Sequence, residues 1–238
     1  MIIIPARLAS TRFPNKVLTE ILGLPMVIRT AKAVECVDNV VIATDSDEVI
    51  KVAKKHNINV VLTSTSHNSG TDRINEAASK LGLKDTEIII NVQADEPFIE
   101  PQIVQSVKTQ IEKISKQSDF TMVSCYKKVD ITEANSPNLV KVVLDKNNKA
   151  LYFSRSLIPY DRENIKIPYF AHLGIYGFTY GSLKEFCNFK ETPLENIEKL
   201  EQLRALYNGK QIDMIEVKSQ SFGIDTKEDL QKALNLFG

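Results

Sequence analysis

Short apolar runs and longer amphipathic stretches alternate along the first half of the chain. The apolar runs predict strands at residues 1–5, 40–43, 60–62 and 87–92. The amphipathic stretches predict helices at residues 25–36, 46–56, 71–81 and 101–116. Strands that are separated by helices of about ten residues are typical of right-handed βαβ units, so we expect a parallel sheet.

The pattern changes after Asp119. Strand-like segments follow at residues 120–126, 140–144, 150–154 and 169–178, with helices expected at 181–187 and 193–207. A strand at 212–217 and a last helix, capped by Thr226 with Asp229 at its third position, complete the chain. We therefore expect an α/β fold of one domain, with a core from residues 1–119 and 211–238 and a mixed-sheet lobe from about 120 to 210.

Composition narrows the function classes. The 238 residues include 30 basic and 30 acidic side chains, and a net charge of zero argues against a nucleic-acid-binding protein. Cys36, Cys125 and Cys187 have no metal-type spacing, which is typical of reduced cysteines in a cytosolic protein. No apolar run approaches ~18 residues and the chain opens on a strand, so we expect a cytoplasmic protein without signal peptide or membrane span.

Three cations follow the first predicted strand: Arg7, Arg12 and Lys16. Open α/β sheets bind ligands at the carboxyl ends of their strands, and fixed cations there suit a triphosphate. The alternative is a solvated basic loop. Neither G-x-G-x-x-G nor G-x-x-x-x-G-K-[ST] occurs, which argues against a dehydrogenase or a P-loop ATPase. Phosphates would instead meet side chains and amides of residues 6–15.

Two aspartates stand just past predicted strands. Asp95 lies in N-V-Q-A-D-E-P and Asp225 in F-G-I-D-T. Each alone is compatible with an ordinary loop or turn residue, particularly Asp95 so close to Pro97. Together, two carboxylates at the carboxyl ends of strands favour a shared Mg²⁺ site against a triphosphate.

Ordered motifs along nearly the whole chain carry a family resemblance. They read I-P-A-R-L-A-S-T-R-F-P-N-K, H-N-S-G-T-D-R, N-V-Q-A-D-E-P, N-L-V-K-V-V-L-D, A-L-Y-F-S-R-S-L-I-P, H-L-G-I-Y-G-F and L-E-Q-L-R. With these motifs the sequence resembles the 3-deoxy-manno-octulosonate (Kdo) cytidylyltransferases. The P-A-R opening is shared with many sugar nucleotidyltransferases, whereas S-R-S-L-I-P, H-L-G-I-Y-G and L-E-Q-L-R are more specific to the Kdo enzymes.

The resemblance implies a nucleotide-diphospho-sugar transferase-like, Rossmann-type mixed sheet whose inserted lobe forms a homodimer interface. It implies transfer of CMP from CTP to Kdo with Mg²⁺, giving CMP-Kdo and pyrophosphate for lipopolysaccharide biosynthesis. No nucleic acid or membrane would take part. Two departures from the family pattern, Ala94 in place of glycine and Ala171 in place of arginine, affect details of sugar binding more than the type of reaction.

The resemblance also assigns residues. Its catalytic residues would be Arg7, Lys16, Asp95 and Asp225, of which the two aspartates hold Mg²⁺. Its nucleotide-binding residues would be Ala6, Arg7, Arg12, Lys16, Ser69, Gly70, Thr71 and Arg73. Its sugar-binding residues would be Gln93, Arg155, His172, Tyr176, Glu201 and Gln202.

Position alone allows plainer interpretations of several of these residues. Residues 69–71 are a good helix start, and Arg73 is compatible with a surface position on that helix. His172 and Tyr176 are compatible with a buried strand. Glu201 and Gln202 are expected on one helix, about 100° apart, so both reach one sugar only from its edge.

Two rival functions remain at this stage. One is a cytidylyltransferase for another acidic sugar, such as a sialic acid, against which the Kdo-type motifs argue. The other is a non-catalytic sensor with the same fold. The presence of Lys16, Asp95 and Asp225 argues against a sensor, because a protein that only binds the nucleotide has no need of a metal pair.

Overall fold

The computed structural model describes residues 1–8, 13–67, 69–116 and 120–238. Its strands are β1 (Ile2–Ala6), β2 (Glu20–Ile21), β3 (Leu24–Pro25), β4 (Val40–Thr44), β5 (Asn59–Leu62), β6 (Ile88–Asn91), β7 (Met122–Val129), β8 (Lys141–Leu144), β9 (Ala150–Ser154), β10 (Tyr169–Thr179) and β11 (Asp213–Glu216). Its helices are η1 (Lys16–Leu18), α1 (Met26–Val34), α2 (Asp47–Lys55), α3 (Gly70–Lys80), α4 (Pro101–Ile114), α5 (Ile131–Ala134), α6 (Tyr180–Asn188), α7 (Pro193–Glu198), α8 (Leu203–Tyr207) and α9 (Lys227–Phe237).

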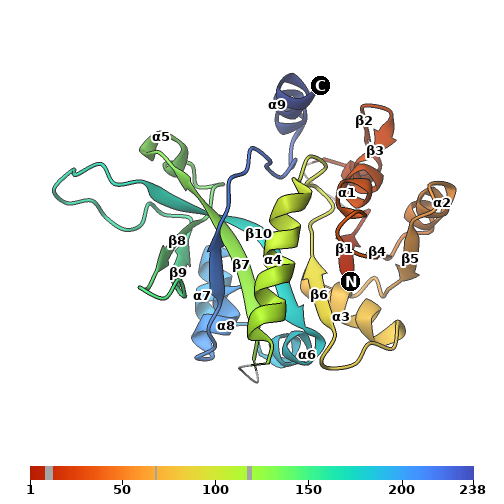
Figure 1. The fold of residues 1–238 in the computed structure, drawn as a ribbon. Coiled ribbons are helices and arrows are strands. Elements are labelled where there is room, and N and C mark those ends of the chain that lie inside the picture. Colours follow the sequence, from red (N-terminus) through yellow and green to blue (C-terminus); the bar gives the residue numbers. More distant parts are fainter. Residues whose placement is uncertain (9–12, 68, 117–119) are drawn as a thin grey trace.

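One sheet of nine strands runs through the molecule in the order β11-β7-β10-β6-β1-β4-β5, with β8 and β9 attached beside β10 (Figure 1). Strands β6, β1, β4 and β5 are parallel, as the βαβ pattern predicts. Strand β10 is antiparallel to both of its neighbours, β6 and β7. The expected lobe therefore contributes β7 and β10 to the same sheet as the core.

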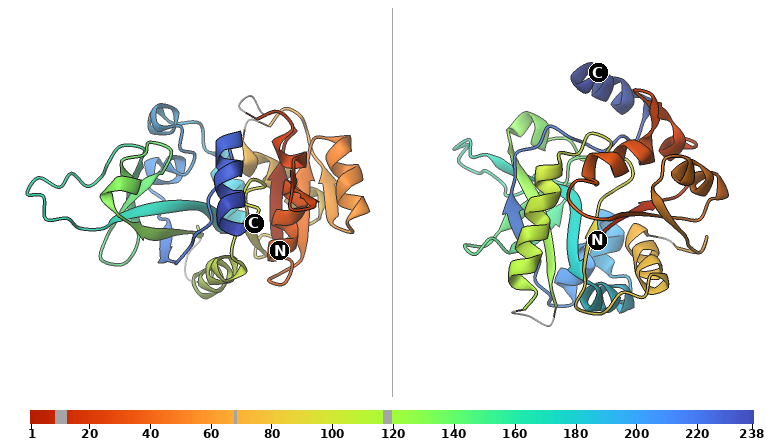
Figure 2. Two further views of the ribbon diagram at one scale, coloured as in Figure 1. Left: turned by 90° about the horizontal axis from the view of Figure 1, so that it is seen from above. Right: turned by 45° about the vertical axis from the view of Figure 1, so that its right-hand side comes forward.

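The period of two along β1 explains how helices cover both faces of this sheet. Ile2 and Ile4 pack into a core with α1, α2 and α4, whereas Ile3 packs into a second core with α3, α6 and α8. Because neighbouring strand residues point to opposite faces, a strand that is buried on both sides must be apolar throughout. The apolar opening of the chain thus becomes the centre of a three-layer structure (Figures 1 and 2).

The other end of the sheet is less regular. Strands β8 and β9 form an antiparallel hairpin around residues 145–149, as expected. The chain between β9 and β10 then projects from the body as a long arm (Figures 1 and 2). At the carboxyl-terminal end Thr226 and Asp229 form the predicted capping box of α9.

The single helix expected at 193–207 is wrong. The helix ends at Lys199, which adopts a left-handed conformation with φ of 54°, and a new helix begins at Leu203. Glu201 and Gln202 consequently lie in the turn between α7 and α8, not on one helix. The short hairpin β2–β3 and the helix α5 are further elements that the apolar pattern does not predict. Among the described residues no helix combines the length and the apolar character that crossing a membrane requires.

Candidate active site

The loop that follows β1 delivers Lys16 to the edge of the sheet. Strand β1 is buried along its whole length, and its last residue, Ala6, pairs with Thr44 of β4. The chain returns through Asn15, which takes a left-handed conformation and opens the short helix η1 at Lys16. Asparagine tolerates this conformation better than most residues. Arg7, directly after β1, is exposed, and Arg12 lies outside the described residues.

Lys16, Asp95 and Asp225 form one cluster, which we call the carboxylate centre. The Lys16 ammonium donates hydrogen bonds of 2.7 Å to Asp95 Oδ2 and of 2.7 Å to Asp225 Oδ1. Burial alone would lower the pKa of Lys16, but the charge of Asp95 and the hydrogen bonds that the ammonium donates to both carboxylates raise it above its ordinary value. The carboxylates themselves remain partly open, with 28% of the Asp95 side chain and 43% of the Asp225 side chain exposed.

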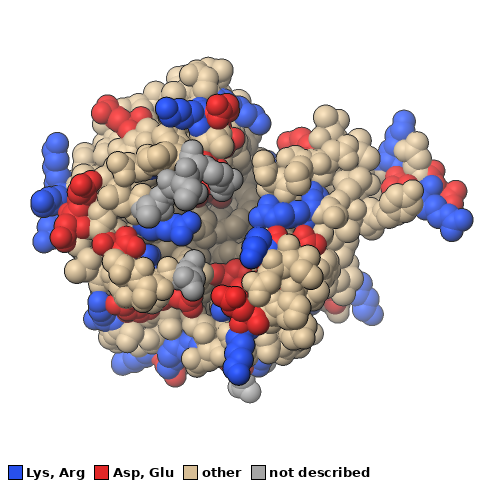
Figure 3. Space-filling model, turned by 180° about the vertical axis from the view of Figure 1, so that it is seen from behind, with Lys and Arg blue, Asp and Glu red and all other residues tan. Residues whose placement is uncertain are grey.

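Both aspartates lie on segments that connect a strand to the next helix. Asp95 sits in the connection between β6 and α4, four residues past the strand. Asp225 sits on the irregular stretch between β11 and α9. The face of the molecule drawn in Figure 3 is hollowed, and both basic and acidic side chains gather around this hollow.

A second group of side chains, the polar pocket, consists of Gln93, His172, Tyr176 and Glu201. It forms where β10 is irregular, because the register of β10 against β7 shifts between Leu173 and Gly177. Gln93 Nε2 donates to the freed carbonyl of Gly174 at 3.3 Å. The rings of His172 and Tyr176 lie 5.5 Å apart between their centroids.

Ser124 of β7 fixes His172 within this irregular part of the sheet. The Ser124 hydroxyl lies 2.8 Å from the carbonyl of Ile175 and 2.9 Å from His172 Nε2. A hydroxyl has one proton to give, so we assign that proton to the carbonyl and the ring proton to Nε2. Burial lowers the pKa of His172 to about 3, and the ring is neutral at physiological pH.

Glu201 reaches the pocket from the turn between α7 and α8. Thr71 donates its hydroxyl proton to Glu201, whose pKa is raised by burial although hydrogen bonds from Thr71 and Ser69 oppose the rise. Burial, and then the charge of Glu201, raise the pKa of Tyr176. The pocket is therefore a group of buried or half-buried hydrogen-bonding side chains in which charge is disfavoured.

Gly70 lets α3 approach the strand that leads to the carboxylate centre. A Cβ atom at this position would lie 3.1 Å from Cγ of Pro5 and 3.8 Å from Oε1 of Gln93. The first of these contacts is tighter than most Cβ contacts, so a side chain here would require Pro5 to shift by a few tenths of an ångström. Ser69, just before it, caps α3 by accepting from the amide of Asp72.

Two predicted site residues are engaged elsewhere. Arg73 is buried, not on the surface, and its guanidinium donates to Asp45 Oδ2 at 2.7 Å and to Thr63 Oγ1 at 2.6 Å. Arg155 follows β9 and donates from Nε to the carbonyl of Glu198 at 2.8 Å, at the end of α7. Gln202, the residue before α8, is buried.

Sequence reasoning missed several residues that shape this region. Glu96 and Glu100 hold the segment that carries Asp225, and Ser124 holds His172. Glu100 precedes Pro101, which reads as an ordinary helix start. No local pattern connects either glutamate to residues more than a hundred positions later.

A lysine and two carboxylates meet at the edge of the sheet where open α/β sheets bind their ligands, beside the polar pocket, and the comparisons identify the class as nucleotidyltransferases. The family model described as cytidylyltransferase matches residues 1–212. The chain belongs to the cytidylyltransferase family and, within it, to the 3-deoxy-manno-octulosonate cytidylyltransferases.

The relatives support this placement over their full length. The 3-deoxy-manno-octulosonate cytidylyltransferase of Nitratiruptor sp. is 60% identical over 98% of this chain and 97% of its own. The enzyme of the same description from Helicobacter pylori is 52% identical over 100% of this chain and 97% of its own.

Solved structures agree with this assignment. CMP:2-keto-3-deoxy-manno-octonic acid synthetase complexed with CTP superposes with a TM-score of 0.90 and 34% identity, over 99% of this chain and 96% of its own. A putative glucose-1-phosphate thymidylyltransferase from Bacillus anthracis reaches a TM-score of 0.66 at 16% identity, over 99% of this chain and 94% of its own. At that level of identity the likeness concerns the fold alone.

Proposed function

We propose that the protein transfers CMP from CTP to the anomeric hydroxyl of Kdo, forming CMP-Kdo and pyrophosphate for lipopolysaccharide biosynthesis. The observation that carries the proposal is the carboxylate centre of Lys16, Asp95 and Asp225, beside the polar pocket with its buried or half-buried hydrogen-bonding groups. Relatives that share at least half of their residues with this chain bear the name of this activity.

The carboxylate centre fits a magnesium ion. One oxygen of each aspartate lies 2.7 Å from the same ammonium nitrogen, so both carboxylates already converge on a point that holds a cation. Mg²⁺ prefers hard oxygen ligands and typically takes one or two carboxylates, the rest coming from phosphates and water. Substrate phosphates would have to supply further ligands, because among the described residues no group of three or more His, Cys, Asp and Glu side chains could hold a metal ion.

Asp95 and Asp225 would hold the ion, and Lys16 would bind the triphosphate. A bound Mg²⁺ lowers the pKa of an attacking hydroxyl and offsets negative charge on a phosphate. Lys16 is buried beside both carboxylates, and as a cation it would stabilise charge that develops toward pyrophosphate. Arg7, and Arg12 outside the described residues, would assist in binding the phosphates.

The polar pocket would receive the sugar. Kdo carries many hydroxyl groups, and Gln93, His172, Tyr176 and Glu201 offer both donors and acceptors within one region. Gln202 and Arg155 would act from its edge. We further propose that residues 69–71 contact the nucleoside part of CTP and that Arg73, whose guanidinium is held by Asp45 and Thr63, supports them from within the fold.

Pyrophosphate release with Mg²⁺ and CTP tests the whole proposal. Kdo, N-acetylneuraminic acid and no sugar are compared, and we expect release with Kdo only. Release with N-acetylneuraminic acid alone would keep the chemistry but refute the assignment of the pocket. Folded protein that binds CTP and releases no pyrophosphate with either sugar would contradict the proposed activity.

We also propose that the protein is a homodimer formed through its lobe, residues 120–210. Seven large apolar side chains of this lobe are exposed: Ile131, Leu151, Tyr160, Ile165, Ile167, Ile197 and Tyr207. A concentration of exposed apolar side chains is typical of an interface. Sedimentation equilibrium tests the proposal, because a monomer at micromolar concentration would contradict it.

We place the reaction in the cytoplasm. Cys36, Cys125 and Cys187 are all free thiols, and free thiols are typical of a reducing compartment. Cell fractionation with an antibody against the protein tests this placement.

A further inference from the structure

Asp225 is carried by a segment that has neither helix nor strand geometry. The described chain leaves β11 at Glu216 and enters α9 at Lys227. We call residues 217–225 the return segment. Asp95, by contrast, follows β6 closely. The position of Asp225 opposite Asp95 must therefore depend on contacts that the return segment makes with its surroundings.

Glu100 makes the most extensive of these contacts. Its Oε2 accepts a hydrogen bond of 2.8 Å from the Ser219 hydroxyl, and its Oε1 accepts one of 2.8 Å from the Gln220 amide. Hydrogen bonds to a carboxylate are shorter and stronger than neutral ones. Both oxygens of Glu100 are thus directed to the return segment, 119 and 120 residues further along the chain.

Glu100 does not serve the helix that follows it. It stands immediately before α4, and its side chain makes no capping hydrogen bond to the first amides of that helix. Both of its oxygens are directed to the return segment instead.

Further ties continue toward Asp225. The Ser221 hydroxyl donates to Oε2 of buried Glu96 at 3.4 Å, and the Ile224 amide donates to the carbonyl of Asp95 at 2.9 Å. The ties therefore run in order, from Glu100 through Glu96 to Asp95 on one side and from Ser219 to Ile224 on the other. They join the loop that carries one carboxylate to the segment that carries the other.

We propose that Glu100 is a positioning residue for the two aspartates of the proposed metal site. By fastening the return segment to the Asp95 loop, it sets the separation of Asp95 and Asp225. The inference rests on the proposed function, since it assigns the two aspartates to Mg²⁺. Groups that orient metal ligands without touching the metal commonly alter metal affinity, whereas a purely structural tie alters stability alone. This difference makes the role measurable.

Two variants of Glu100 test the proposal. Glu100→Ala removes both acceptors, and Glu100→Gln keeps one acceptor oxygen at the same reach. We expect Glu100→Ala to raise the Mg²⁺ concentration at half-maximal turnover about three- to tenfold, with the KM for Kdo unchanged. Glu100→Gln should give a smaller rise, and Ser219→Ala should add little to Glu100→Ala because both remove the same tie.

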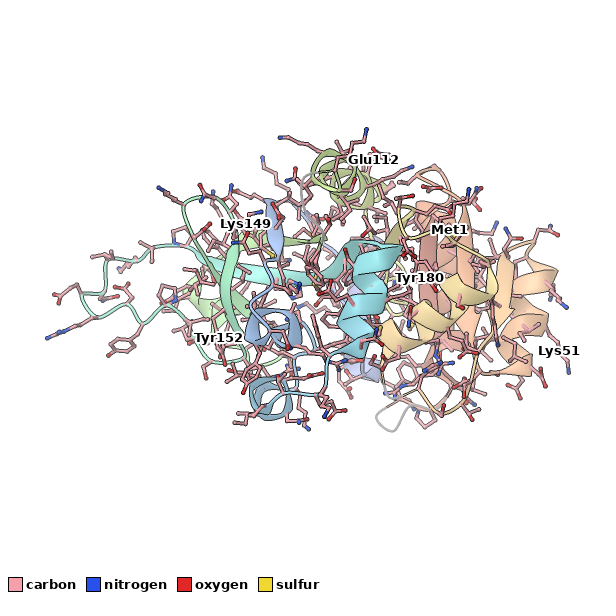
Figure 4. All side chains as sticks on the ribbon, turned by 90° about the horizontal axis from the view of Figure 1, so that it is seen from below. Met1, Lys51, Glu112, Lys149, Tyr152 and Tyr180 are labelled. Atoms are coloured by element: carbon pink, nitrogen blue, oxygen red, sulfur yellow. The ribbon has the colours of Figure 1, made fainter. Side chains whose placement is uncertain are left out.

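Hydrogen exchange of the nucleotide-free, metal-free protein supplies a readout independent of turnover. In Glu100→Ala the amides of residues 220–225 should exchange faster, while those of β1 and β6 keep their wild-type protection. Glu112→Ala is the matched control, because it removes an exposed carboxylate from the outer side of the same helix (Figure 4). It should change neither exchange nor the metal requirement.

The outcomes separate this inference from the proposed function. Faster exchange with an unchanged Mg²⁺ requirement in both Glu100 variants would show that the contact only stabilises the fold, and would overturn the inference. Unchanged exchange would overturn it as well. An Asp225→Asn variant with wild-type turnover and Mg²⁺ requirement would overturn the metal site itself, and the positioning role with it. If Glu100→Ala loses protection throughout the fold, Glu100→Gln decides by the same criteria.

Discussion

The carboxylate centre and the polar pocket solve opposite electrostatic problems a short distance apart. The centre keeps three charges together and leaves its carboxylates partly exposed, with a lysine whose pKa is raised. The pocket buries its ionisable groups and shifts their pKa values toward the neutral forms, as at His172 and Glu201. A site that must bind a charged triphosphate and a polyhydroxylated sugar thus keeps fixed charge for one and neutral hydrogen bonding for the other.

The largest effect should come from removing the cation of the centre. Lys16→Met keeps the length of the side chain but not its charge, and we expect turnover to fall about 10²–10³-fold, as for other lost electrostatic contacts to a transition state. The KM for Kdo should stay close to wild type, because the pocket is untouched. Steady-state pyrophosphate release and thermal unfolding measure both. Lys227→Met, an exposed lysine at the start of α9, is the control, and near-normal turnover in Lys16→Met would remove the charge argument.

Removing the ion pair that holds the turn between α7 and α8 should affect the polar pocket but not the carboxylate centre. Arg204 donates from Nε to Glu195 Oε2 at 2.9 Å, and both side chains are nearly buried. Removing one partner leaves an uncompensated buried charge, so Arg204→Met should cost roughly 3 kcal/mol of unfolding free energy. It should also raise the KM for Kdo, because Glu201 lies in this turn. Denaturant unfolding and kinetics measure the two effects, and a rise in the Mg²⁺ requirement instead would contradict the separation of the two regions.

The pH dependence of stability should report the neutral state of the pocket. The pKa of His172 is about 3 in the folded protein and ordinary when unfolded, so the unfolded state binds the extra proton. The contribution of the neutral His172 ring to the free energy of unfolding is complete above pH ~6.5. It falls by about 1.4 kcal/mol per pH unit as the pH drops toward 3. In His172→Asn this part of the slope should vanish, whereas His56→Asn at the end of α2 should keep it. Equal slopes in wild type and His172→Asn, from urea unfolding between pH 4 and 7, would refute the assignment.

The smallest effect should come from the junction between the two regions. In Gly70→Ala the new methyl group meets Pro5 at 3.1 Å on one side and approaches Gln93 on the other. We expect a loss of about 1 kcal/mol in unfolding free energy and a higher KM for CTP. Gly181→Ala, in the first turn of α6 with contacts of 3.4 Å, is the matched control and should be neutral or slightly stabilising. Similar losses in both variants would point to a general glycine effect.

The sequence predicts the half of the fold that depends on local order. Apolar runs and helical periods locate β1, β4, β5 and β6 with their helices, and Thr226 with Asp229 predicts the cap of α9. The motifs also predict that Lys16, Asp95 and Asp225 belong to one site, and the structure brings these three side chains into contact. Short-range patterns suffice here because parallel strands end at a common edge.

The rest depends on contacts that local patterns do not contain. Lys199 ends α7 in a left-handed conformation that usually calls for glycine, so a continuous helix through 193–207 is the natural but wrong prediction. Arg73 looks like a surface residue until Asp45 and Thr63 are seen beside it. Glu100 has no recognisable local role, and its oxygens bind Ser219 and Gln220, which lie 119 and 120 residues further along the chain.

The span of the carboxylate centre has a consequence for how the molecule is made. Lys16 and Asp95 are 79 residues apart in the chain, whereas Lys16 and Asp225 are 209 apart. Closing a long loop costs more entropy than closing a short one, and contacts of high sequence separation form late in folding. A growing chain on the ribosome therefore contains Lys16 and Asp95 long before Asp225 has been added. The complete centre can form only after synthesis has passed residue 225 and after the strands that carry its residues have paired.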